Sequence, residues 1–305
     1  MLVPSLSILK LARAGKYAVP AFNVNDLEML KAIMRAAEEL CSPIIVQTSE
    51  GAIEYAGMDY LIAMVRVAAK AAIPVVLHLD HGKNLDVIKT AISSGYTSVM
   101  FDGSALSYAE NVRLTKQVVK WARAKRVSVE AELGSIKGIE DLVSIAVRNA
   151  VLTNPEQAKQ FVKETGCDTL AVAIGTAHGA YKFKGVTHLD LDRLKKIATL
   201  VKLPIVLHGA SGVMEDVVEL AEKHGAKLGE MRGVLDEDIK QAVKLGVAKI
   251  NIDTDLRLAF TAGIREAVDE LPTVIDPRQL LEPASLLMTE VAKYKINLFG
   301  STNKG

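Results

Sequence analysis

Residues 74–82 of the chain read Pro-Val-Val-Leu-His-Leu-Asp-His-Gly. The apolar first half is typical of a strand in a parallel sheet that is covered on both faces. The second half places Asp80 and His81 where this strand is expected to give way to a loop. The stretch therefore predicts a buried parallel strand that carries chemically active side chains at its carboxyl end.

Two further apolar runs end in the same way. Residues 170–179 read LAVAIGTAHG and carry His178, and residues 204–209 read PIVLHG and carry His208. One such histidine is more simply explained as a core or loop residue with local hydrogen-bond partners, but three at equivalent strand ends favour a shared role. Imidazole is a strong ligand for Zn²⁺, and three protein ligands with an open position are typical of a catalytic metal site. We therefore predict that His81, His178 and His208 bind a metal.

Short apolar runs alternate with amphipathic helical patterns along the whole chain. The chain contains eight units of one strand and one helix. This number of units favours a (β/α)₈ TIM barrel, an α/β fold, over a doubly wound sheet. No linker or break in composition divides residues 1–305, so we predict a single domain, with one extra C-terminal helix at 277–298. The predicted strands are 19–24, 44–48, 75–79, 98–101, 128–132, 169–174, 205–207 and 248–252, and the predicted helices are 28–40, 60–71, 86–93, 108–124, 155–165, 189–200, 236–245 and 257–270.

The composition restricts the class of protein. The 37 basic and 36 acidic side chains nearly cancel, and no basic stripe is present, which argues against nucleic acid or an anionic membrane as a partner. The apolar runs are far shorter than the ~20 residues that span a bilayer. The sequence begins without a secretory signal pattern, and Cys41 and Cys167 have no CxxC spacing, so we expect reduced thiols and a cytoplasmic protein. His188 and His224 are expected at the surface.

Polar residues follow nearly every predicted strand. The carboxyl ends of barrel strands converge on one face, where the active sites of this fold lie. A ring of polar residues there is difficult to explain by packing alone, and within it Asp80 is a carboxylate placed to transfer protons beside the metal. The members of the ring are Asn23, Gln47, Ser49, Asp80, His81, Asp102, Ser104, Glu132, His178, His208 and Asn251.

Glycines and small polar residues follow the last three predicted strands. Backbone N–H groups after strands seven and eight commonly bind phosphate in this fold, and glycine lets the backbone approach an anion closely. A metal, a phosphate site and a carboxylate together indicate chemistry on a small phosphorylated sugar or ketone. The predicted phosphate-binding residues are Gly179, Gly209, Ala210, Ser211, Asn251, Ile252, Asp253 and Thr254.

Four motifs in this order resemble those of the class II, metal-dependent ketose-bisphosphate aldolases. The similarity extends from Ala-Phe-Asn at 21–23 to Leu-Phe-Gly-Ser at 298–301, so it covers nearly the whole chain. It implies a (β/α)₈ fold, a homodimer or homotetramer, and reversible cleavage of fructose or tagatose 1,6-bisphosphate into two triose phosphates, a step of glycolysis and gluconeogenesis. The motifs are HLDHG at 78–82, AIGTAHG at 173–179, LHGASG at 207–212 and KINIDT at 249–254.

The resemblance also implies which residues bind ions. His81, His178 and His208 match the zinc ligands of the family, for which Co²⁺ is a possible substitute. Asp102 and Glu132 match carboxylates that hold a second divalent metal in some members. The phosphate-binding residues named above match the dihydroxyacetone phosphate site, where a monovalent cation (Na⁺, K⁺ or NH₄⁺) often assists.

Five further residues match positions that act on or contact the substrate. Asp80 matches the acid/base at the C4 hydroxyl. Glu140, on a loop similar to the mobile loop of the family, matches the group that exchanges the proton next to the ketone. Asn23 and Ser49 match contacts to the rest of the substrate. Arg278 matches a residue that reaches the far phosphate of a neighbouring subunit's substrate.

Three alternatives differ in substrate or in class. Residues 214–233 and 253–257 resemble the fructose-type branch and tend to be absent from tagatose-type members, so fructose is favoured and tagatose 1,6-bisphosphate is the alternative. A metal-dependent sugar-phosphate epimerase on the same fold would need two opposed acid/base groups flanking one carbon. A non-enzymatic sugar-phosphate sensor would not need Asp80, and its presence beside three predicted ligands argues against that hypothesis.

Overall fold

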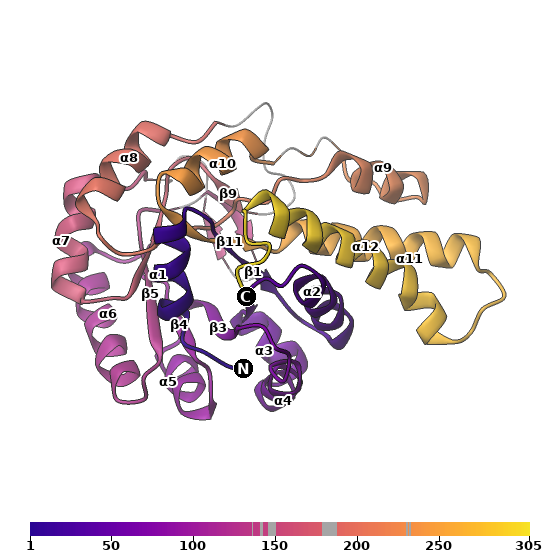
Figure 1. The fold of residues 1–305 in the computed structure, drawn as a ribbon, viewed down its shortest axis with the longest axis horizontal. Helices are drawn as coiled ribbons and strands as arrows, with labels where there is room; N and C mark the ends of the chain where they lie inside the picture. Colours follow the sequence, from indigo (N-terminus) through magenta and orange to yellow (C-terminus); the bar gives the residue numbers. More distant parts are fainter. Residues whose placement is uncertain (136, 141–142, 146–150, 179–187, 230, 232) are drawn as a thin grey trace.

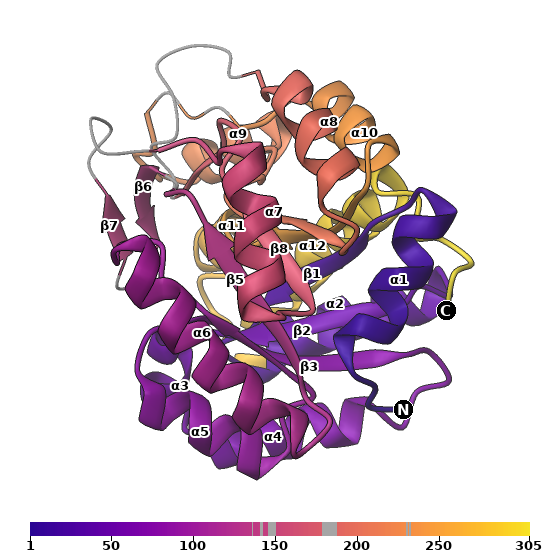
Figure 2. The same cartoon turned by 90° about the vertical axis from the view of Figure 1, so that its left-hand side faces the viewer.

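The computed structural model describes residues 1–135, 137–140, 143–145, 151–178, 188–229, 231 and 233–305. Eight parallel strands form a closed barrel (Figures 1 and 2), which confirms the predicted fold. In their order around the barrel the strands are β1 (Val19–Asn23), β11 (Val247–Ile252), β10 (Ile205–Leu207), β8 (Thr169–Val172), β5 (Ser128–Leu133), β4 (Ser98–Phe101), β3 (Val75–Gly82) and β2 (Ile44–Thr48).

Amphipathic helices surround the barrel (Figure 1). Buried apolar residues between the strands and these helices form one continuous core, which includes Phe22, Leu77 and Phe101. Within the described residues, no helix is both long and apolar enough to cross a membrane. The helices after the barrel strands are α2 (Leu27–Glu39), α3 (Glu50–Ala56), α4 (Met58–Ala68), α5 (Leu85–Ser94), α6 (Tyr108–Arg123), α7 (Pro155–Thr165), α8 (Leu191–Leu200), α9 (Glu215–Lys223), α10 (Asp236–Lys244) and α11 (Thr254–Glu270).

Helix α1 (Ser5–Gly15) is not among the helices predicted from the sequence. Its Ile8 and Leu9 pack against a second group of buried residues, which includes Val19, Ile45 and Val76 near the starts of three barrel strands. These inward-facing apolar side chains need cover from water at the amino-terminal end of the barrel. The helix supplies that cover, at the end opposite the predicted site.

A small sheet lies beside the barrel and consists of β7 (Val143–Ile145), β6 (Lys137–Glu140) and β9 (Ala177–His178), in that order. The sequence predicts His178 at the end of the sixth barrel strand, but that strand, β8, ends at Val172. Gly175, with a φ of 111°, lies between β8 and β9 and interrupts the extended backbone. His178 instead pairs with Gly138 of β6, so the small sheet brings two loops together.

Helices α11 and α12 (Pro277–Leu298) form a long pair that extends away from the barrel (Figure 1), and α12 matches the predicted extra helix. Gly263 of α11 lies directly against the backbone of α12. A Cβ atom at Gly263 would be 2.4 Å from the backbone N and Cα of Ala284. The close approach of the two helices therefore requires glycine at this position.

Gly263→Ala tests this contact. By helix propensity alone the change would stabilise α11 by about 1 kcal/mol, but overpacking a buried contact costs about 1–3 kcal/mol. We expect a lower melting temperature in thermal unfolding followed by circular dichroism. Val268→Ala, at a side chain of α11 that is 64% exposed, is the control and should leave the melting temperature unchanged or slightly higher. A higher melting temperature for Gly263→Ala would contradict the packing argument.

Candidate active site

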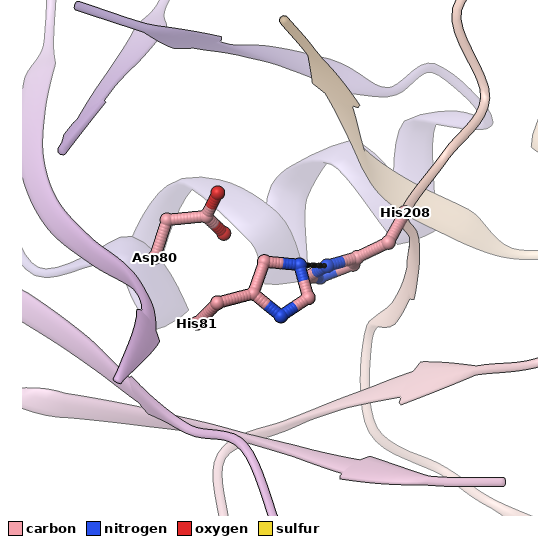
Figure 3. Close-up of side chains that lie close together, drawn as sticks. All are labelled: Asp80, His81 and His208. Atoms are coloured by element: carbon pink, nitrogen blue, oxygen red, sulfur yellow. Dashed lines mark hydrogen bonds between the residues drawn. The ribbon is translucent and has the colours of Figure 1, made fainter. Parts of the chain in front are cut away.

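The carboxyl ends of β3 and β10 bring Asp80, His81 and His208 together (Figure 3). One ligand atom from each residue lies within 4.8 Å of the others. Asp80 and His208 are buried, and the side chain of His81 is only 9% exposed. Three of the predicted site residues therefore share one cluster that is shielded from water.

Strand β3 departs from regular geometry at His81. Neighbouring side chains of a regular strand point to opposite faces, yet Asp80 and His81 both lie close to His208. His81 has a φ of 47°, in the left-handed region, and the register of β3 with β4 shifts at this point. A Cβ at Gly82 would be 2.6 Å from the carbonyl oxygen of Met100, so the irregular strand end also requires glycine. Backbone strain of this kind, of order 1–3 kcal/mol, gathers at functional sites.

His208 is held at both ring nitrogens. Its Nδ1 lies 2.8 Å from Nε2 of His81, and its Nε2 lies 2.7 Å from Oε1 of Glu130 on β5. Glu130 also accepts a 2.9 Å hydrogen bond from Nζ of Lys249 on β11. Burial alone would raise the pKa of Glu130, but Lys249 and His208 outweigh burial and lower it. Glu130 is therefore a carboxylate that accepts from Nε2–H of His208, which leaves Nδ1 as the nitrogen with a lone pair.

Glu130 and Lys249 are not among the site residues predicted from the sequence. Their spacing in the sequence could have revealed them. Glu130 lies two residues before Glu132, and Lys249 lies two residues before Asn251. Residues two apart on a barrel strand face the same side. His78 joins their network, since its Nε2 accepts a 3.2 Å hydrogen bond from Nζ of Lys249. Burial together with Lys249 lowers the pKa of His78 to about 3. His78 is thus a neutral, buried residue of β3.

Three side-chain amides surround the carboxylate of Asp80. Its Oδ2 accepts hydrogen bonds of 3.1 Å from Asn23 and from Gln47, and its Oδ1 accepts one of 2.9 Å from Asn251. Burial alone would raise the pKa of Asp80, but nearby cationic groups, His81 foremost, outweigh burial and lower it. The carboxylate is therefore ionised and fixed in orientation, in a state that can accept a proton.

Asp102 and Glu132 lie close to the other ring nitrogen of His81. Oδ2 of Asp102 is 3.0 Å from Nδ1 of His81, and Oε2 of Glu132 is 4.0 Å from the same nitrogen. Burial and the neighbouring Asp102 raise the pKa of Glu132 well above its usual value. Burial alone would lower the pKa of His81, but Asp80 and Asp102 outweigh it and raise the pKa to about 10. The surrounding carboxylates thus favour a positive charge at this position.

The donor atoms present fit a divalent metal ion. A tetrahedral Zn²⁺ with bonds of about 2.0–2.1 Å holds its ligand atoms roughly 3.3 Å apart. The facing nitrogens of His81 and His208 are 2.8 Å apart, which brings two potential ligand atoms together. Among the described residues, Oε2 of Glu132 is buried without a hydrogen-bond partner and offers a further oxygen ligand. Asp102 accepts from His81 in the way that commonly orients a metal-binding imidazole.

The predicted phosphate-binding residues that the structure describes lie on two adjoining segments, one directly after β10 and one that runs from the end of β11 into the start of α11. The carboxylate of Asp255 joins them by accepting hydrogen bonds of 3.2 and 2.8 Å from the backbone of Gly212 and Val213. Nζ of the buried Lys295 of α12 lies 3.2 Å from the same carboxylate. The positive end of the α11 dipole lies at this junction and favours an anion. The predicted residues here are Gly209, Ala210, Ser211, Asn251, Ile252, Asp253 and Thr254.

Strands β6 and β9 carry two more predicted site residues. Glu140 ends β6 and His178 ends β9, and the two strands pair in parallel. Gly179 falls outside the described residues. The segments predicted to supply the third imidazole and a proton-transfer carboxylate are therefore neighbours in one small sheet.

Ser49 and Arg278 occupy different positions from the central cluster. Oγ of Ser49 accepts a 3.1 Å hydrogen bond from the backbone of Ala52 and so caps α3 at its first turn. Arg278 lies in the first turn of α12 with a side chain that is 90% exposed, and its guanidinium contacts Asp276 at 2.7 Å. The structure does not bring Arg278 to the site of its own chain.

Comparison with known proteins places these features in a family. The sequence matches the family described as fructose-bisphosphate aldolase class-II over residues 3–304. It is 50% identical over 304 residues to the fructose-bisphosphate aldolase of Thermus caldophilus and 46% identical over 306 residues to that of Helicobacter pylori, with 100% of each chain covered in both cases. The crystal structure of the YdjI aldolase from Escherichia coli K12 superimposes with a TM-score of 0.81 at 35% identity, covering 100% of this chain and 99% of that one.

Fold, site and comparisons together define a barrel enzyme of the aldolase class. The chain belongs to the class II fructose-bisphosphate aldolase family. The resemblance that the four sequence motifs predict is therefore confirmed.

Glu130→Gln tests whether this carboxylate orients His208 for metal binding. Loss of such a supporting carboxylate commonly costs about 10–100-fold in metal affinity, and we expect that loss for Zn²⁺ in competition with a chromophoric chelator. The single variant should also be less stable, because Lys249 is left buried opposite a neutral partner. The double variant Glu130→Gln, Lys249→Met should recover stability but not affinity. Wild-type affinity in the double variant would exclude the orienting role.

Proposed function

We propose that this enzyme catalyses the reversible, metal-dependent cleavage of fructose 1,6-bisphosphate into dihydroxyacetone phosphate and glyceraldehyde 3-phosphate. The observation that carries the proposal is the buried cluster of Asp80, His81 and His208 in a chain of this family. The names of the relatives from Thermus caldophilus and Helicobacter pylori support fructose over tagatose bisphosphate as the substrate. The proposal includes a role in cytoplasmic glycolysis and gluconeogenesis, with residues 1–305 acting as one domain.

The proposed metal ligands are His81, His178 and His208, with Zn²⁺ as the ion and Co²⁺ as a substitute. When bound, the ion polarises the ketone carbonyl of the substrate and stabilises the negative charge that develops there. Asp102 and Glu132 are proposed to hold a second divalent ion, since both carboxylates lie next to His81 in a second group of potential ligand atoms.

Asp80 is proposed to transfer the proton of the C4 hydroxyl. In the cleavage direction its carboxylate accepts this proton while the C3–C4 bond breaks, so that C4 becomes the aldehyde carbon and the electron pair goes to the C3 fragment. The amides of Asn23, Gln47 and Asn251 support this role, because they hold both carboxylate oxygens in place. Glu140 is proposed to donate the proton that C3 needs to complete dihydroxyacetone phosphate.

The phosphate beside the ketone is proposed to bind at the two segments that meet at the start of α11. Gly209, Ala210 and Ser211 would supply one side, residues 251–254 the other, and Gly179 a further backbone contact. A monovalent cation (Na⁺, K⁺ or NH₄⁺) is proposed to assist there. Asn23 and Ser49 are proposed to contact the middle of the substrate.

The far phosphate is proposed to bind Arg278 of a neighbouring subunit in a homodimer or homotetramer. A bisphosphate needs a cationic group at each end, and arginine presents a bidentate fork to phosphate. Arg278 is 90% exposed on the helix pair that extends from the barrel (Figure 1), so it is accessible to another chain. The oligomer would then be required for full activity.

A coupled assay with fructose and tagatose 1,6-bisphosphates, with and without a chelator, tests the proposed function. We expect higher kcat/KM with the fructose substrate, loss of cleavage after removal of the metal, and recovery with Zn²⁺ or Co²⁺, because the buried imidazoles and carboxylates bring potential metal ligands together. Full activity after verified metal removal, or trapping of a lysine imine by borohydride, would contradict metal-dependent cleavage. Preference for the tagatose substrate would contradict the substrate assignment alone.

Arg278→Ala tests the contribution of the neighbouring subunit. The variant should raise KM for the bisphosphate and leave the affinity for dihydroxyacetone phosphate nearly unchanged, because only the far phosphate loses its partner. Mixed oligomers of Arg278→Ala and Asp80→Ala chains should recover activity, since some sites then combine an intact Asp80 with an intact Arg278. Mixed oligomers that form, as shown by mass spectrometry, but recover no activity would rule out a shared site.

A further inference from the structure

A second group of potential ligand atoms lies outside the active site, between α9 and α11. His224 follows the last residue of α9, and Glu266 and Glu270 lie one helical turn apart on α11. One nitrogen of His224 and one carboxylate oxygen from each glutamate lie within 4.8 Å of one another. Residues four apart on a helix share a face, so both carboxylates of α11 are directed to the same side of that helix.

The imidazole of His224 is almost completely shielded, with 2% of the side chain exposed, which corrects the expectation that it lies at the surface. His188, by contrast, has a side chain that is 71% exposed. Nδ1 of His224 lies 2.8 Å from Oδ2 of Asp269, to which its N–H donates. Among the described residues, the buried Nε2 has no hydrogen-bond partner, and Oε1 of Glu270 is 3.9 Å away from it. A shielded nitrogen without a hydrogen bond therefore points to an occupant between the ring and the carboxylates.

The chemistry of these atoms suits a divalent transition-metal ion. With Nδ1–H donated to Asp269, Nε2 presents its lone pair towards the carboxylates, and a carboxylate that fixes a ligating imidazole in this way is the usual support of a zinc site. Ligand atoms around a tetrahedral Zn²⁺ lie roughly 3.3 Å apart, so 3.9 Å between Nε2 and Oε1 is too long for a hydrogen bond but close to the spacing that an ion imposes. Lys223 competes with an ion for the carboxylate of Glu270, because its Nζ is 4.0 Å from the same Oε1 at the exposed edge.

We propose that His224, Glu266 and Glu270 bind a divalent transition-metal ion of the Zn²⁺ type, with water completing the coordination on the side of Glu270, which is 55% exposed. The ion links α9 to α11. Helix α9 follows the segment of Gly209 to Ser211, and α11 begins at Thr254, so the two helices that the ion joins each lead away from one half of the proposed phosphate site.

Metal stoichiometry tests the site in the intact enzyme. Wild type, Glu266→Gln and His224→Gln are saturated with Zn²⁺, and in parallel with Co²⁺, freed of unbound ion, and measured by inductively coupled plasma mass spectrometry. Both variants should bind one metal ion per chain fewer than wild type and keep their aldol cleavage activity, because neither residue touches the active site. Glu290→Gln is the control, since Glu290 lines the same groove as Glu266 and Glu270 without belonging to the cluster, and it should bind as wild type does.

Thermal unfolding provides a second measurement that does not depend on activity. Added Zn²⁺ should raise the melting temperature of wild type and Glu290→Gln by more than that of Glu266→Gln, because an ion that binds only the folded state stabilises it. Equal stoichiometry in all four proteins would overturn the proposal and leave the cluster as an ion pair between helices. Loss of the ion in Glu266→Gln but not in His224→Gln would overturn it as well, because the imidazole would not be a ligand.

Discussion

The contact of Glu130 with Lys249 and His208 inside the barrel is the interaction on which the site depends. It runs from β5 to β11, two strands that are not neighbours in the barrel, and every member is buried. Removal of one partner from a buried charge pair typically costs about 3–5 kcal/mol, because the other charge is left without compensation. The same carboxylate fixes the ring of His208, so one group sets both the charge balance of the interior and the orientation of a potential metal ligand.

The charged groups around His81 lie next to this network. Asp80, Asp102 and Glu132 lie around His81 with little water to screen them, and the carboxylates favour a cation between them. The irregular end of β3 places two consecutive side chains in the same cluster, which a regular strand does not allow. Local strain and negative charge therefore occur together at the end of the barrel that carries the candidate site.

Helix α12, which lies outside the eightfold pattern, supports residues near the candidate site. Lys295 of α12 contacts Asp255, and Asp255 holds the backbone after β10, so the last helix of the chain supports a segment proposed to bind phosphate. Gly263 allows α11 and α12 to approach closely enough for this contact. The additional helix therefore contacts the barrel at a segment proposed to bind phosphate.

The sequence by itself determined the barrel, because apolar strands and amphipathic helices are local patterns that their own residues specify. It also predicted that Asp80, His81 and His208 lie on one face, since the carboxyl ends of parallel strands must converge once the fold is known, and the three residues do lie together. Tertiary structure alone decided that Glu130 meets Lys249, that His178 lies in a small sheet beyond β8, that α1 covers the barrel, and that His224 is shielded. These outcomes depend on which distant segments face each other, and that depends on backbone geometry and packing in three dimensions.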